Sequence, residues 1–217
     1  MRTVATEDYL KAIYKLQRRT GLAANAAIAE ELGVKPASVT GMVGKLVQMG
    51  LVRHAPYHGA QLTGEGERLA LEVVRHHRLV ELYLSEFLGY PLDRVHAEAD
   101  RLEHAVSPEL AERLAEKLGH PAADPHGDPI PTKEGAIVEP RHERLCDVEP
   151  ETSVVVRRVS DSDPERLRYL AELGLVPSAN VRVVSTEPFG GPVILEVKGV
   201  ERALGRELAA TIGVSRS

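Results

Sequence analysis

The sequence contains little sulfur and few aromatic side chains. Among its 217 residues are one cysteine, three methionines and no tryptophan, and 4% of the residues are aromatic. Cys146 alone can form neither an internal disulfide nor a cysteine-rich zinc site, which is typical of a protein in a reducing compartment. Any metal site must therefore use histidine, aspartate and glutamate.

Long apolar runs are also missing. Runs such as 154–156 and 193–195 are far shorter than the roughly 18 residues that a membrane span needs. The first eight residues lack the apolar segment of a secretory signal. We therefore expect a cytoplasmic protein with no membrane partner. The length suits two or three small domains rather than one large core.

Acidic residues are absent from one stretch of an otherwise acidic protein. The net charge is −5, yet no carboxylate occurs between Glu31 and Glu65. The stretch carries instead Lys35, Lys45, Arg53, His54 and His58. A basic stretch without acids in an acidic protein indicates a surface that faces phosphate.

The first third of the chain predicts a winged helix-turn-helix domain over 1–66. Apolar spacing predicts helices over about 4–19, 25–33 and 36–49, with Asn25 as an N-cap and Pro36 at a first helical position. Helix, glycine turn and helix form the helix-turn-helix arrangement. Extended segments at 51–54 and 60–63 flank a turn at 56–59 and predict a two-stranded wing.

One side of the third predicted helix has the composition of a DNA-reading surface. Small side chains leave room for base edges, hydroxyl groups bond to bases or phosphates, and lysines pair with phosphate. The predicted DNA contacts are Lys35, Pro36, Ala37, Ser38, Thr40 and Lys45, with Arg53 and His58 on the wing. A three-helix unit that binds a protein is the alternative, but the missing carboxylates favour double-stranded DNA.

The middle third, 67–140, places titratable side chains on apolar helix faces. A helix over 63–87 carries His77 and Glu81 on its apolar stripe, where a single histidine would more often be a core residue. A helix from 92 to 106 places four more titratable side chains within an arc of about 100° around its axis. These four are His96, Asp100, Glu103 and His104. Two histidines and two carboxylates facing a His/Glu pair predict a site for a divalent first-row metal.

Two further segments complete the organisation. A helix over 107–119, with Leu110, Leu114 and Leu118 on its buried face, joins the preceding pair to offer apolar faces for a two-fold dimer. Proline and glycine make 119–135 a loop or linker. From about 150 to 217, strands at 154–156, 181–184 and 193–197 and a helix after Asp163 predict a small β domain.

The order and spacing of several short motifs resemble one known family. They are Thr6-Glu7-Asp8-Tyr9-Leu10, Leu62-Thr63, His77-Arg78-Leu79, Val95-His96, Glu103-His104 and Gly127-Asp128-Pro129-Ile130-Pro131. The chain resembles the diphtheria-toxin-repressor family of metal-dependent transcriptional regulators, which has iron-dependent and manganese-dependent branches. The pattern of 170–193 resembles the FeoA-type, SH3-like barrel at the end of the family's long members.

This resemblance implies a mainly α fold with a small β part: a winged-helix domain, a helical dimerisation domain and an SH3-like β-barrel. It also implies a homodimer on a pseudo-palindromic operator, with no small-molecule substrate and no enzymatic activity. Two metal sites follow from it. The regulatory site matches Asp8, Asp100, Glu103 and His104. The ancillary site matches His77, Glu81 and His96, completed from the C-terminal domain, where Asp163 is a candidate that could equally cap a helix.

Two departures from the family bear on the metal. The iron-responsive branch carries methionine and cysteine where this chain has Asp8 and Asp100. Because Mn(II) prefers oxygen donors, the change favours Mn(II) over Fe(II), although other divalent first-row metals are expected to bind in vitro. Lys11 replaces a glutamate of the short manganese regulators, which favours separated sites over a paired-metal centre.

Three alternatives stay open at this stage: an iron-responsive regulator of the same family, a metal-independent winged-helix protein and a hydrolytic metalloenzyme. The last fits poorly, because catalysis needs an open coordination position and a substrate cleft. Here the ligands come from several helices, and one belongs to the DNA-binding segment.

Overall fold

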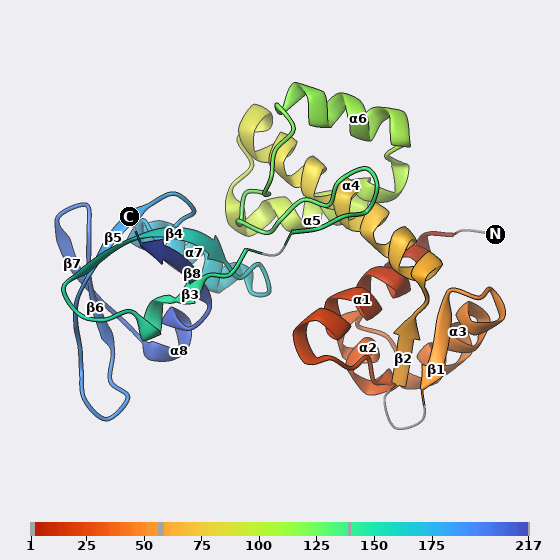
Figure 1. The fold of residues 1–217 in the computed structure, drawn as a ribbon, viewed down its shortest axis with the longest axis horizontal. Coiled ribbons are helices and arrows are strands. Elements are labelled where there is room, and N and C mark those ends of the chain that lie inside the picture. The colour runs from red at the N-terminus through yellow and green to blue at the C-terminus, as the bar shows by residue number, and fades with distance from the viewer. Residues whose placement is uncertain (1–2, 56–58, 139, 217) are drawn as a thin grey trace. The chain divides into compact units, whose positions relative to one another are not determined.

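The computed structural model describes residues 3–55, 59–138 and 140–216, which form two compact units (Figure 1). One unit is built from the residues up to His77 together with Glu103–Ser107 and Pro131–Ala136. The other is built from Arg78–Leu102, Pro108–Ile130 and the residues from Ile137 onward. Within the described part of the chain, no helix is both long enough and apolar enough to cross a bilayer.

The first unit begins with three helices, α1 (Val4–Thr20), α2 (Asn25–Glu31) and α3 (Pro36–Gln48). The hydroxyl oxygen of Thr3 caps α1 by accepting the N–H of Thr6, and Gly21 ends the helix with a left-handed φ of 75°. Pro36 is the first residue of α3, as predicted. The prediction that Asn25 is an N-cap is wrong: Ala24 holds that position. The Asn25 amide instead donates to Thr40 Oγ1 at 3.3 Å.

An antiparallel hairpin follows, formed by β1 (Val52–Ala55) and β2 (Gly59–Leu62). Gly59 has a φ of 70°, and a Cβ there would lie 2.3 Å from the Ala23 carbonyl oxygen, so this close approach requires glycine. The segment 56–58, which includes the predicted DNA contact His58, lies outside the described residues. The helices and the hairpin share a core of fully buried side chains: Leu10, Ile13, Leu16, Ile28, Val39 and Leu46.

The middle of the chain forms α4 (Gly64–Leu88), α5 (Leu92–Leu102), the 3₁₀ turn η1 (Glu103–Ala105) and α6 (Pro108–Lys117). The predicted single helix from 92 to 106 is therefore wrong beyond Leu102. In η1 the N–H of Val106 bonds to the Glu103 carbonyl, and a 3₁₀ turn advances about 120° per residue rather than 100°. The predicted arc of about 100° assumed one continuous helix, so it does not describe the positions of Glu103 and His104.

The segment after α6 is a packed loop rather than an exposed linker. Residues 124 and 126–130 are buried, and Asp124 Oδ1 accepts the N–H groups of His126 and Asp128 at 2.9 Å each. Gly127 has a φ of 91°, and a Cβ there would lie 1.9 Å from the Arg157 carbonyl oxygen. The backbone of this 124–130 loop also pairs with β4, because Val159 donates to the His126 carbonyl at 2.9 Å.

The last third is a six-stranded antiparallel sheet in the order β3-β8-β4-β5-β6-β7, consistent with the expected SH3-like domain. Its strands are β3 (Glu143–Arg144), β4 (Thr152–Val159), β5 (Asn180–Thr186), β6 (Val193–Val197), β7 (Val200–Leu204) and β8 (Ile212–Arg216). The 3₁₀ turn η2 (Leu145–Asp147) and the helices α7 (Pro164–Leu173) and α8 (Arg206–Ala209) accompany the sheet (Figure 1). Cys146 is buried in this core, and α7 packs against α5. The mainly α fold with a small β part is confirmed.

Candidate metal sites and nucleic-acid interface

Asp8, Glu103 and His104 come together in the first unit. His104 Nε2 lies 2.9 Å from Asp8 Oδ1 and 3.4 Å from Glu103 Oε1. One ligand atom from each of the three side chains lies within 4.8 Å of the others. α1 supplies Asp8, and η1 supplies the other two. Two carboxylate oxygens and an imidazole nitrogen form a donor set that suits a divalent cation.

The electrostatics around Asp8 favour a bound cation. Burial raises the pKa of Asp8, and the charge of Glu103 raises it further, whereas His104 and Lys11 lower it. The net shift is upward, so the negative charge of this carboxylate is poorly stabilised by the protein alone. A divalent cation at this position would compensate that charge.

Glu7 orients the histidine of this site and was not predicted. His104 Nδ1 lies 2.6 Å from Glu7 Oε2, a contact that leaves Nε2 facing Asp8 and Glu103. A carboxylate behind a ligating imidazole fixes its ring orientation and its tautomer. One usable signal was its position, since Glu7 directly precedes Asp8 in the first turn of α1.

Glu103 also takes part in a buried contact with Lys11 and His77. Lys11 Nζ lies 2.9 Å from Glu103 Oε1 and 2.6 Å from Oε2, and His77 Nδ1 lies 2.5 Å from Oε2. Burial raises the pKa of Glu103, but the bond to His77 and the charge of Lys11 outweigh burial and hold it below its usual range. Glu103 is therefore a stable carboxylate. The assignment of His77 to the ancillary site stays a prediction.

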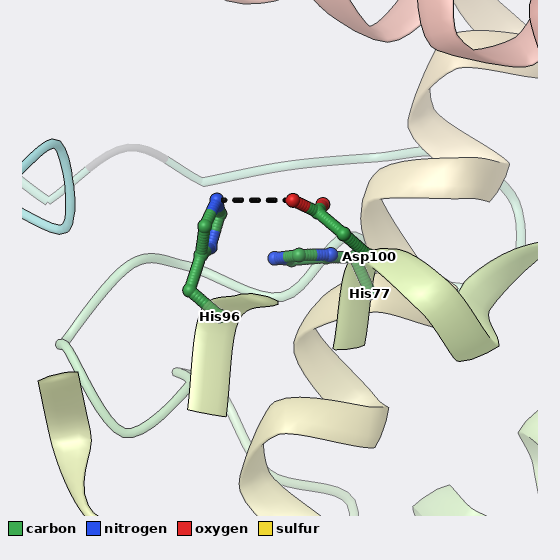
Figure 2. Close-up of side chains that lie close together, drawn as sticks. All are labelled: His77, His96 and Asp100. Carbon is green, nitrogen blue, oxygen red and sulfur yellow. Dashed lines mark ion pairs between the residues drawn. The ribbon is translucent and has the colours of Figure 1, made fainter. Parts of the chain in front are cut away.

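In the second unit, His96 gathers three carboxylates. Its Nδ1 lies 2.9 Å from Glu81 Oε1 and 3.6 Å from Asp161 Oδ2. Its Nε2 lies 3.7 Å from Asp100 Oδ2, the ion pair drawn as a dashed line in Figure 2. Glu81 and His96, both members of the predicted ancillary set, are thus in contact, and their role as ligands stays a prediction. Asp100, expected in the regulatory set, has His96 as its partner here, and its regulatory role stays a prediction.

The C-terminal candidate Asp163 has a structural role in this arrangement. Its Oδ1 accepts the N–H groups of Glu165 and Arg166 and so caps α7. Asp161, two residues earlier, is the carboxylate that approaches His96. Asp163, and not Asp161, was singled out from the sequence.

Glu81, Asp124 and His126 form a third cluster, and all three side chains are buried. His126 Nε2 lies 3.0 Å from the Leu92 carbonyl oxygen and must donate to it, so in the neutral imidazole Nδ1 carries a lone pair. That Nδ1 has no hydrogen-bond partner in the described part of the chain and lies 3.9 Å from Glu81 Oε2. A fully buried acceptor without a donor, beside two carboxylates, fits a cation.

Asp124 supports this assignment. Burial raises its pKa well above the usual range, the charges of Glu81 and Asp128 raise it further, and Arg78 opposes the shift. Sequence reasoning missed Asp124 and His126 because they lie in a proline- and glycine-rich segment. Their burial depends on contacts that the segment makes with α5 and β4.

The predicted DNA surface is exposed on α3. Val39, Val43 and Leu46 of this helix are buried, whereas the predicted DNA contacts from Lys35 to Lys45 face solvent. Arg53 on β1 is also exposed. Thr40 Oγ1 accepts from Asn25, which places α2 next to this surface. One face of a single helix therefore presents small, hydroxylated and basic side chains without a carboxylate.

Three family models match consecutive parts of the chain. The N-terminal DNA-binding domain of iron-dependent repressors matches residues 1–60, and their metal-binding and dimerisation domain matches residues 63–132. The FeoA domain matches residues 143–216. The chain belongs to the diphtheria-toxin-repressor family. As a member of this family, it is a metal-dependent, DNA-binding transcriptional repressor.

Relatives in the diphtheria-toxin-repressor family align over almost the whole chain. The iron-dependent repressor IdeR of Mycobacterium tuberculosis is 34% identical, covering 97% of this chain and 96% of the relative. The diphtheria toxin repressor of Corynebacterium efficiens is 31% identical, covering 97% and 95%. A solved manganese-dependent transcriptional repressor in complex with manganese is 37% identical, with a TM-score of 0.86 and coverage of 98% and 100%.

These relatives are described as repressors, so the metalloenzyme alternative has no support among them. However, some of them are described as iron-dependent and others as manganese-dependent. Membership of the diphtheria-toxin-repressor family consequently leaves the metal to be argued from this chain's own donor atoms.

Proposed function

We propose that the chain is a homodimeric repressor that binds a pseudo-palindromic operator when loaded with Mn(II). The observation that carries the metal choice is the donor set of Asp8, Glu103 and His104, which contains two carboxylates, one imidazole and no sulfur. Mn(II) binds weakly to nitrogen and sulfur donors relative to later first-row metals, so a site without sulfur removes an advantage of its competitors. Cys146 is buried in the core of the C-terminal sheet and belongs to a different structural context.

The same three residues would couple the cation to DNA reading. A bound divalent ion would supply positive charge between Asp8 on α1 and Glu103 and His104 on η1. α1 packs against α2, α3 and β2, so a fixed α1 fixes the recognition helix as well. A dimer fits successive major grooves only when its recognition helices lie about 34 Å, or a multiple of it, apart. Activation therefore requires tighter metal binding in the arrangement that meets this spacing.

A second cation would lie among Glu81, Asp124 and His126. His96 lies next to Glu81, and Asp161 lies next to His96. The unpartnered, fully buried Nδ1 of His126 supports this second position. Each cluster offers two carboxylates, which suit Mn(II), with one imidazole and no sulfur donor.

The dimer surface is supported by apolar side chains that the chain itself leaves uncovered. Leu110 was predicted to be buried, but it is 45% exposed, and Phe87, Leu88 and Leu102 are similarly open. These residues lie on α4, α5 and α6, within the segment that matches the metal-binding and dimerisation model. A second copy covering them would form a two-fold contact.

Fluorescence anisotropy with a labelled DNA of the promoter next to the protein's own gene tests the proposal. Metal-stripped protein should bind weakly, Mn(II) should restore binding, and EDTA should abolish it again. His104→Gln should lose the metal response while circular dichroism and dimer mass stay unchanged. Glu103→Gln should also lose the metal response, but with a lower free energy of unfolding, because it leaves Lys11 buried without its anionic partner. Glu172→Gln, an exposed glutamate on α7, is the matched control and should behave as wild type.

Two results would contradict this function. Tight binding that EDTA leaves unchanged would identify a metal-independent winged-helix protein. Activation by anaerobic Fe(II) with no response to Mn(II) would instead assign the chain to the iron-responsive alternative.

A further inference from the structure

We propose that Lys11 is a built-in competitor of the metal. Its ammonium group pairs with Glu103 and sets how tightly the first site, formed by Asp8, Glu103 and His104, holds a divalent cation. The inference rests on the proposed function, in which Glu103 is a metal ligand. It adds a residue that controls affinity without itself being a ligand.

The geometry places Lys11 on the oxygens that the metal needs. Its Nζ lies within 2.9 Å of both Glu103 oxygens. Glu103 Oε1 also faces His104 Nε2, the nitrogen that approaches Asp8. A cation bound through Oε1 would therefore share this oxygen with the ammonium group or displace it.

Burial of the ion pair makes displacement of Lys11 from this position unfavourable. The residue is 7% exposed, and its partner Glu103 is 2% exposed, so the pair is almost completely removed from water. A buried ammonium group without an anionic partner is very unfavourable. Displacing Lys11 from Glu103 thus opposes metal binding.

Lys11 and Asp8 also lie three residues apart on α1, which puts them on the same face of the helix. One face of α1 therefore offers both a ligand and a fixed positive charge to the same site. Because the charge is tethered, it cannot be diluted away, and its competition is independent of protein concentration. Removing the charge should raise the affinity for any divalent cation.

The competing view is that Lys11 only holds Glu103 in place. The two roles predict opposite signs. Loss of a competitor tightens metal binding, whereas loss of a positioning contact leaves Glu103 less ordered and weakens binding. Neutral substitutions of Lys11 therefore separate them.

The test is a titration of metal-stripped full-length protein with Mn(II), in which free Mn(II) is measured by electron paramagnetic resonance. The binding phase that disappears in His104→Gln identifies the first site. In Lys11→Met and Lys11→Gln we expect the dissociation constant of this phase to fall by about tenfold or more, because a nearby like charge is removed. The dissociation constant for Co(II), measured by its absorption, should fall by a similar factor, because a charge effect does not depend on ligand softness.

Lys15→Met is the control, since Lys15 lies one turn further along α1 and outside this cluster, and its binding should match wild type. An unchanged or weaker phase in both Lys11 variants would overturn the inference while leaving the proposed function intact. A gain for one metal alone, or unfolding of both variants by circular dichroism, would also overturn it. If no phase disappears in His104→Gln, the proposed site itself is wrong.

Discussion

Asp8 and Asp100 carry hard oxygen donors where iron-responsive members of the family have a thioether and a thiol. The double variant Asp8→Met, Asp100→Cys should therefore lose activation by Mn(II) and keep or gain activation by Co(II) and Fe(II). Anaerobic anisotropy titrations with each metal measure this ranking. Asp8→Asn, Asp100→Asn serves as the control, because it removes the charges without adding sulfur, and should weaken the response to every metal.

The position of Asp100 makes this a demanding test. It pairs with His96, so its substitution also alters the surroundings of Glu81. Should the sulfur-containing variant keep the wild-type metal ranking, donor softness does not set the choice, and cavity size or the second site would have to do so.

The second site can be tested by counting the metal ions bound to a His126 variant. Replacing its orphaned Nδ1 in His126→Leu should reduce bound Mn(II) from two ions per chain to one, measured by elemental analysis after gel filtration. His142→Leu, a partly buried histidine outside all three clusters, should leave the count unchanged. Two ions retained by the His126 variant would remove this residue from the ligand set.

At the scale of the element, α3 and β1 form the surface that we expect to contact phosphate. Lys45→Ala and Arg53→Ala should weaken binding to specific and unrelated DNA alike and lower the slope of log affinity against log salt by about 1 each. Salt-dependent anisotropy measures this slope. Arg202→Ala, on β7 of the C-terminal sheet, removes an equal charge from another domain and should leave it unchanged. Wild-type slopes in both variants would place DNA on a different surface.

For some elements, the local sequence pattern was enough to predict the structure. Pro36 and the stripe of Val39, Val43 and Leu46 fix the start and the buried face of α3, and these signals lie within one short segment. β7 was missed because four of its five residues are exposed and show no alternation. Its position in the sheet depends on pairing with β6, which the segment itself does not encode.

The sites depend more strongly on distant contacts. The chemistry of Glu103 was predicted from its neighbours, but its bonds to Lys11 and His77 join residues that are 92 and 26 positions away. The end of α5 at Leu102 also escaped a periodicity argument, which assumes that a helix continues. Asp124 and His126 had the composition of a linker, and only the docking of their loop buries them.

At the scale of the whole molecule, the 124–130 loop connects helical and sheet segments of the second unit. Asp128 Oδ1 lies 2.7 Å from Arg158 Nε on β4, and Arg78 on α4 lies 3.5 Å from Asp124 and donates to the Pro129 carbonyl. Arg168 on α7 adds an ion pair with Asp93 on α5 at 2.9 Å. The C-terminal sheet is thus attached to the helical segment by polar contacts that need no metal.

Gly127 is the tightest point of this attachment. Gly127→Ala should lower the free energy of unfolding by roughly 2–4 kcal/mol, because a Cβ would overlap the Arg157 carbonyl oxygen and the left-handed φ disfavours alanine. Urea denaturation followed by circular dichroism measures the change. Gly205→Ala, where no atom lies within 4 Å of the added Cβ, should cost much less. Equal midpoints for the two variants would show that the loop can leave β4 without loss of stability.

The 92 positions between Lys11 and Glu103 also have a consequence during translation. At about 5–20 residues per second, the ribosome adds Glu103 roughly 5–20 s after Lys11. Within that interval α1, α2 and α3 are completed once Gln48 has been added, while Glu103 and His104, two of the three proposed ligands, do not yet exist. Each newly made chain therefore passes through a period in which its helix-turn-helix segment is present and the proposed metal site is not yet complete.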